Sequence, residues 1–110
     1  MNIEKMNEVA RQVSDIMRLL SSEKRLMILC RLAEGEKSVG ELAELLDMRQ
    51  ASLSQQLALL RQKDIVETRR DAQTIYYKVA REDVQGLLEF LHNNYCPIDE
   101  ETEECGYVST

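Results

Sequence analysis

The chain has 110 residues, of which 44% are hydrophobic, with one proline, four glycines, three cysteines and a formal net charge of −6. This length leaves room for one domain with a modest core, which argues against a complex catalytic architecture. No apolar run reaches the roughly 20 residues that span a membrane, and the first eight residues are too polar for a signal peptide. We therefore expect a helix-rich cytoplasmic protein that has no membrane partner and keeps its cysteines as thiols.

Apolar residues recur at helical spacing in the first third of the chain. Between Met6 and Leu20 they form a single stripe, which predicts an amphipathic helix. Ser21 and Ser22 can cap a second helix, and Gly35 suits the end of that helix. The stripe of the first helix consists of Met6, Val9, Val13, Ile16, Met17 and Leu20.

Two further helices follow in close succession. Ser38 and Glu41 have the spacing of a capping box, in which each side chain satisfies a backbone N–H group at the helix start. The short helix that they open carries Leu42, Leu45 and Leu46. After a turn around residues 47–49, we expect a helix over about residues 50–63 that points Leu53, Leu57 and Leu60 inward.

The sequence then changes to a strand pattern. Residues 65–70 and 73–79 are rich in β-branched and aromatic side chains and flank a predicted tight turn at residues 71–72. A last amphipathic helix carries Val84, Leu87, Leu88, Leu91 and Tyr95, and Pro97 should end it. The predicted fold is therefore mainly α with a small β-hairpin.

The negative charge is concentrated at the end of the chain. Residues 99–110 contain five acidic side chains and no basic one, and the remainder has 14 basic and 15 acidic residues. Between Arg49 and Arg81, seven basic residues stand against three acidic ones. We expect one domain over residues 1–98 with a locally basic middle, followed by a disordered acidic tail over residues 99–110.

Two short helices joined by a tight turn and followed by a hairpin define a winged helix-turn-helix, whose second helix fits the DNA major groove. Glutamine can pair with N6 and N7 of adenine, and serine suits phosphate or either base type. Polar residues of this kind also occur on ordinary solvated helices, but the capping box and the basic hairpin favour DNA. The expected contacts are Gln50, Ser52, Ser54, Gln55 and Gln56 on the helix, with Arg69, Arg70, Gln73 and Thr74 at the hairpin tip.

Several co-linear segments resemble the ArsR/SmtB family of winged-helix repressors over roughly residues 5–96. The resemblance implies a homodimer built from the first and last helices, which binds double-stranded DNA at an inverted-repeat operator. The chain departs from the family pattern at Gln56, where many members carry histidine, and at Arg49, where serine often starts the helix. The segments are residues 25–29, 38–43, 51–57, 60–70 and 75–79.

Members of this family sense metals, metalloids or reactive sulfur. One familiar metal site is a Cys-x-Cys in the first helix of the helix-turn-helix, but residues 39–44 contain no cysteine. The other uses paired Asp/His and His/Glu ligands on the last helix, where this chain offers Asp83, Glu89 and the lone His92. We therefore expect neither zinc nor nickel at those positions, and no cofactor.

Cys30 and Cys96 match the cysteine pair of the sulfide- and redox-responsive branch of the family. The resemblance implies a dithiol that becomes a disulfide or a polysulfide bridge and then releases DNA. The inducer would be a polysulfide, a persulfide or an oxidant, because a thiolate attacks the oxidised sulfur and the second cysteine resolves the intermediate. Considered without the resemblance, the cysteines are expected to be inert thiols, and Cys30 in particular to fill part of the core.

Cys105 leaves three interpretations open. It can be an incidental thiol of the tail, a competing resolving thiol, or the third ligand of an arsenite site with Cys30 and Cys96, since three thiolates suit a thiophilic metalloid. The acidic composition also allows a protein-interaction module without a DNA role. An enzyme is not expected, because no nucleophile–base pair or phosphate loop is visible.

Overall fold

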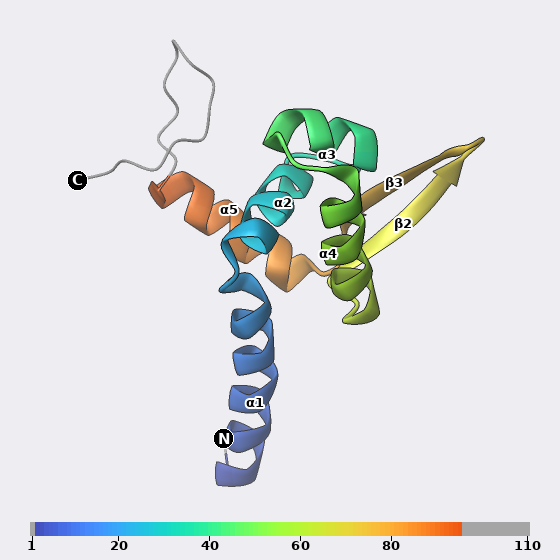
Figure 1. The fold of residues 1–110 in the computed structure, drawn as a ribbon. Helices are drawn as coiled ribbons and strands as arrows, with labels where there is room; N and C mark the ends of the chain where they lie inside the picture. Colours follow the sequence, from blue (N-terminus) through green and yellow to red (C-terminus); the bar gives the residue numbers. More distant parts are fainter. Residues whose placement is uncertain (1, 96–110) are drawn as a thin grey trace.

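The computed structural model describes residues 2–95, which form five helices and a small three-stranded antiparallel sheet (Figure 1). This confirms the predicted winged helix-turn-helix. The acidic tail, Cys96, Cys105 and the predicted stop at Pro97 lie outside the described residues. The order is α1 (Ile3–Leu20), α2 (Glu23–Ala33), β1 (Lys37–Ser38), α3 (Val39–Leu46), α4 (Gln50–Gln62), β2 (Val66–Asp71), β3 (Thr74–Val79) and α5 (Glu82–Tyr95).

The helix boundaries follow from local capping. The Ser22 side chain accepts a hydrogen bond from the backbone N–H of Arg25 at the start of α2. At the start of α3 the predicted capping box is present, because the backbone N–H of Glu41 donates to Ser38 Oγ at 3.2 Å and the Ser38 N–H donates to Glu41 Oε1 at 3.0 Å. Gly35 follows α2 with φ = 153°, a conformation that L side chains rarely adopt, and therefore ends the helix as expected.

One core holds the helix-turn-helix against the sheet and α5. The three leucines expected to point inward from α4 are fully buried. Each such side chain stabilises the fold by roughly 1.5–3 kcal/mol relative to an exposed one, so the orientation of α4 about its own axis is fixed. The core residues are Leu20, Ile28, Leu29, Leu32, Leu42, Leu53, Leu57, Leu60, Ile65, Val66, Val84 and Leu88.

The sheet differs from the prediction in two respects. The strands lie in the order β1–β3–β2, and the two-residue β1 was not predicted because a segment this short carries no alternating pattern. The register pairs Asp71 with Thr74, so the turn consists of Ala72 and Gln73 rather than residues 71–72. The prediction was wrong by one position because Ala72 takes the left-handed conformation, φ = 57°, which asparagine or aspartate would normally signal.

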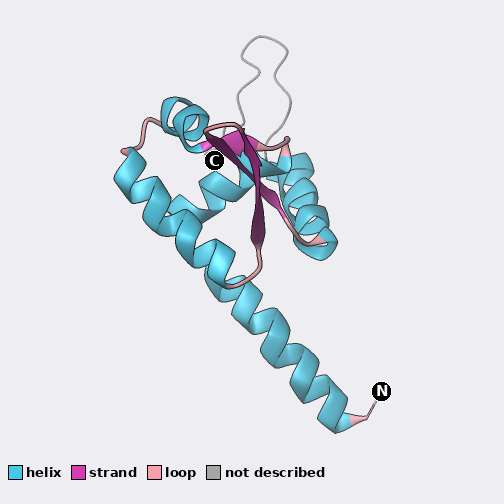
Figure 2. Ribbon diagram, turned by 90° about the vertical axis from the view of Figure 1, so that its right-hand side faces the viewer, coloured by secondary structure: helices cyan, strands magenta, loops and turns pink. Residues whose placement is uncertain are grey.

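Helix α1 projects away from the rest of the chain, as Figures 1 and 2 show from two directions. Of its predicted apolar stripe, Leu20 is buried and Ile16 packs partly against the core. The rest of the stripe faces outward, with Met6, Val9, Val13 and Met17 all exposed. None of the helices over residues 2–95 combines the length and apolarity needed to cross a bilayer.

Candidate nucleic-acid interface and thiol cavity

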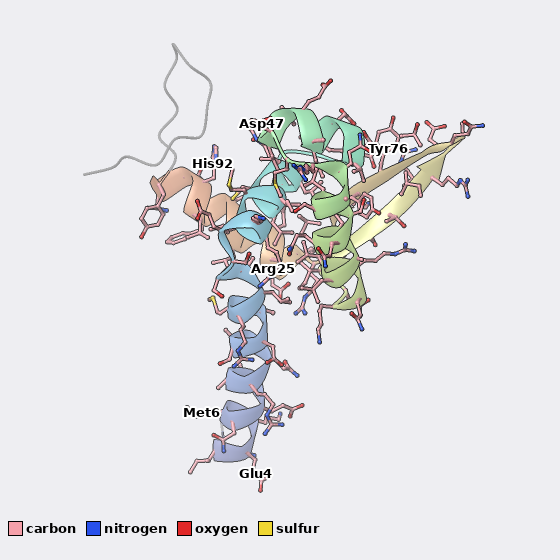
Figure 3. All side chains as sticks on the ribbon, viewed as in Figure 1. Glu4, Met6, Arg25, Asp47, Tyr76 and His92 are labelled. Atoms are coloured by element: carbon pink, nitrogen blue, oxygen red, sulfur yellow. The ribbon has the colours of Figure 1, made fainter. Side chains whose placement is uncertain are left out.

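The turn between α3 and α4 sets the angle of the helix-turn-helix. Asp47 ends α3 in the left-handed conformation, φ = 52°, which its short polar side chain tolerates (Figure 3). The Met48 N–H donates to the Ala43 carbonyl at 3.2 Å, and the Met48 side chain packs against the core. Arg49 is the N-cap residue of α4 but makes no side-chain capping hydrogen bond, because arginine has no acceptor atom. Its side chain is exposed at the start of the helix.

The face of α4 opposite the buried leucines is exposed and polar. Gln50, Ser54 and Gln55 are exposed, whereas Ser52 and Gln56 on one flank are half-buried. Two alanines of this face were not predicted, because small apolar residues do not stand out as DNA contacts in a sequence, and Gln62 was not predicted either. Their helical spacing with Gln55 would have revealed all three: Ala51, Ala58 and Gln62.

The tip of the wing formed by β2 and β3 is exposed. Arg70, Gln73 and Thr74 all lie there with accessible side chains. Arg70 Nε donates to the carbonyl of Ala72 at 3.2 Å, which directs the guanidinium toward the turn. These three residues therefore occupy the position expected for contacts to a DNA backbone.

Arg69 points to the other side of β2 and has partners within the chain. Its Nε donates to Glu36 Oε2 at 3.2 Å, and its guanidinium carbon lies 4.8 Å from the centre of the Tyr76 ring. The hydrogen bond from Arg69 lowers the pKa of the Glu36 carboxyl group. Both wing arginines were predicted to contact DNA. Arg69 instead links the wing to Glu36 in the segment before β1, whereas the guanidinium of Arg70 lies at the exposed tip and is more accessible to a DNA ligand.

Cys30 belongs to α2 and lines two hollows, one of about 290 Å³ between α2 and α5 and one of about 350 Å³ that α3 also lines. Both hollows are lined by Cys30, Glu34 and His92. Burial raises the pKa of the Cys30 thiol, with Glu34 adding to the effect and Arg31 opposing it. A raised pKa disfavours the thiolate, which is the form of cysteine that acts as a nucleophile.

Within residues 2–95 no group of three His, Cys, Asp or Glu side chains is placed to hold a metal ion. Asp83, one of the acidic residues considered for the last helix, pairs with Arg81 at 2.7 Å between Oδ2 and Nη2. This hydrogen bond lowers the pKa of the Asp83 carboxyl group. Cys96 and Cys105 lie outside the described residues, so neither the dithiol nor the three-thiol arrangement is described.

An exposed polar second helix in a helix-turn-helix, followed by a basic wing, defines a winged-helix DNA-binding protein. The model of the arsR family of bacterial regulatory proteins matches residues 22–68. The chain belongs to this family and is a transcriptional regulator. It is 40% identical over 96 residues to the transcriptional activator HlyU of Vibrio cholerae, covering 87% of this chain and 89% of HlyU. It is 44% identical over 95 residues to the biofilm growth-associated repressor of Agrobacterium fabrum, covering 86% of this chain and 81% of that repressor.

Solved structures show the same similarity. The crystal structure of HlyU from Vibrio vulnificus has a TM-score of 0.82 and 41% identity, covering 87% of this chain and all of that one (100%). The winged helix-turn-helix DNA-binding domain Mb0332 of Mycobacterium bovis has a TM-score of 0.71 and 31% identity, covering 86% of both chains. That domain is described as homodimeric.

Proposed function

We propose that the chain is a repressor that binds an inverted-repeat operator as a homodimer and releases it when Cys30 and Cys96 are oxidised or persulfidated. The observation that carries the DNA-binding part is the polar face of α4 beside the exposed tip of the wing. In this proposal Gln50, Ser54 and Gln55 contact base edges in the major groove. Arg70, Gln73 and Thr74 contact the sugar–phosphate backbone or the minor groove. Ser52, Gln56 and Arg69 lie at the margins of this surface.

The exposed apolar residues support the dimer. Val9, Val13 and Met17 on α1, and Phe90 and Tyr95 on α5, remain exposed in the single chain. Apolar surface of this extent is normally covered by a partner. A two-fold symmetric dimer of the kind described for the similar Mb0332 domain would cover it and present two α4 helices to an inverted repeat.

The hollow between α2 and α5 beside Cys30 supports the proposal that the thiols sense an inducer. The end of α5 contributes His92 and Asn93 to its wall, and Cys96 follows the last described residue, Tyr95, directly in the sequence. A thiolate at one cysteine attacks a sulfur atom of a polysulfide, and the shortened polysulfide leaves. The second cysteine attacks the resulting persulfide and expels hydrosulfide, which leaves a disulfide. Because this bond would tie α2 to the residue that follows Tyr95 in the sequence, it would alter the spacing of the two DNA-contacting helices.

The test is intact-mass measurement combined with operator binding, after separate treatment with polysulfide, peroxide and arsenite. After polysulfide or peroxide treatment of wild type and Cys105→Ser we expect a loss of two hydrogens, or with polysulfide a gain of sulfur, together with loss of DNA binding. Cys30→Ser and Cys96→Ser should bind the operator normally and keep binding it after treatment. Because burial raises the pKa of Cys30, its modification rate should still be rising as pH passes about 8.5, the pKa of a free cysteine.

Two results would contradict the sensing proposal. If Cys30→Ser still releases DNA on treatment with polysulfide, the dithiol is not the switch. If only arsenite releases DNA and the adduct requires Cys105, the protein is an arsenite-responsive regulator that uses three thiols.

A further inference from the structure

Arg25, in the first turn of α2, contacts two other helices with one guanidinium group. Its Nε donates to the carbonyl oxygen of Leu19 in the last turn of α1 at 2.8 Å. Its Nη1 donates to Oε1 of Gln56 on the flank of α4 at 3.4 Å. Figure 3 shows Arg25 where α1, α2 and α4 come together.

Both acceptors are groups that need a donor. Leu19 belongs to the last turn of α1, whose carbonyl groups have no partner within the helix. Gln56 is half-buried, and its amide can turn either its oxygen or its nitrogen toward a neighbour. Because arginine only donates hydrogen bonds, the oxygen of Gln56 must face Arg25 and the NH₂ group must point away from it.

The contacts of Arg25 are not explained by charge neutralisation. Among the ion pairs of the described residues, none involves Arg25. The side chain is half-buried at its position in α2, and its two side-chain hydrogen bonds reach neutral acceptors on other helices. A planar guanidinium that donates in two directions fixes the relative position of its acceptors more strictly than a lysine ammonium group does.

We propose that Arg25 is a positioning residue that sets the recognition helix α4 relative to α1, and thereby sets the spacing of the two α4 helices on an inverted repeat. The inference rests on the proposed function, in which α1 forms the dimer and α4 enters the major groove. In a symmetric dimer, a shift of α4 relative to α1 is applied to both protomers. Binding to two half-sites is then impaired, whereas binding to one half-site is not.

The test compares the affinity for the full inverted repeat with the affinity for an isolated half-site. We expect Arg25→Ala to weaken binding to the full repeat by about five- to tenfold, the range typical of coupled neighbouring residues, and to leave half-site affinity unchanged. The Arg25→Ala protein should also distinguish less well than wild type between the native operator and repeats in which one or two base pairs are added or removed at the centre. Arg25→Lys should restore only part of the loss, because lysine cannot reproduce the two directed hydrogen bonds.

A double-mutant cycle tests whether Arg25 acts through Gln56. If Arg25 acts through Gln56, removing Arg25 has no further effect once Gln56 is absent. The ratio of full-repeat affinity to half-site affinity should therefore be no lower in the double variant Arg25→Ala, Gln56→Ala than in the single variant Gln56→Ala. Arg18→Ala is the matched control, because Arg18 lies next to Leu19 at the end of α1 but is exposed, and within residues 2–95 its guanidinium pairs with Asp15 alone. That variant should keep the wild-type ratio and the wild-type spacing preference.

Three results would overturn the inference. Equal losses on the full repeat and the half-site would indicate direct DNA contact or general destabilisation, and thermal unfolding would separate those two causes. Additive effects of the two substitutions would show that Arg25 does not act through Gln56, and full rescue by lysine would show that only the charge matters. If wild-type protein binds neither DNA, the proposed function itself fails.

Discussion

Helix α4 buries one side against the core, whereas α1 is exposed along most of its length, and the exposed residues of the two helices differ in character. On α1 the exposed side includes Val9, Val13 and Met17, whereas on α4 it includes Ser54 and Gln55. Contact of the apolar residues of α1 with another apolar surface stabilises the complex in proportion to the apolar area removed from water. The polar side of α4 gains little from such burial, but its side chains can hydrogen bond to base edges. The exposed side of a helix thus indicates what kind of partner it has.

Charge placed on the apolar side of α1 should have the largest effect. Val13→Glu puts a carboxylate into the dimer surface, where burying an unpaired charge is very costly. We expect the protein to become monomeric and to lose roughly 100-fold or more in operator affinity, because the two half-sites are no longer bound together. Sedimentation velocity and a DNA titration measure the two effects.

Asn7→Glu is the matched control for this substitution. It adds the same charge to an exposed position of α1 that lies outside the apolar stripe. It should leave the protein dimeric with nearly unchanged DNA affinity. A Val13→Glu protein that stays dimeric would show that α1 does not form the interface.

Removal of a polar side chain from α4 should have an intermediate effect. Gln55→Ala deletes a group at the centre of the exposed face, and a good base contact contributes about 1–3 kcal/mol to discrimination. We expect operator affinity to fall about tenfold, while affinity for unrelated DNA and the melting temperature remain unchanged. Competition titrations with the two DNAs measure this difference.

The smallest effect is expected at the wing. Arg70→Ala should weaken binding several-fold on all sequences alike and reduce the salt dependence of binding by about one counterion, because it removes one phosphate contact. Arg81→Ala is a suitable control, since Arg81 pairs with Asp83 at the start of α5. Unchanged affinity in both Gln55→Ala and Arg70→Ala would refute the proposed DNA surface.

Local patterns predicted the helices well and the long-range contacts poorly. The spacing of Leu53, Leu57 and Leu60 is a helical period, and the Ser38–Glu41 capping box is contained within one turn, so both were visible in the sequence. The turn at Ala72 was misplaced by one residue because alanine gives no signal for a left-handed conformation.

Two side-chain pairs at the margin of the proposed DNA surface could not be predicted from the sequence. Arg69 meets Glu36 across 33 positions of the sequence, and Arg25 meets Gln56 across 31. Neither pair has a local pattern, because each depends on how separate elements pack together. The hollows beside Cys30 could not be predicted for the same reason, since they form where α2 packs against α3 and α5.

The contrast between α1 and α4 is tested most directly by the mass of the reduced protein bound to an operator-length inverted repeat, measured by native mass spectrometry. The account predicts two chains per duplex for wild type and no stable complex for Val13→Glu at the same concentration. One chain per wild-type duplex, or a wild-type-like complex formed by Val13→Glu, would contradict it.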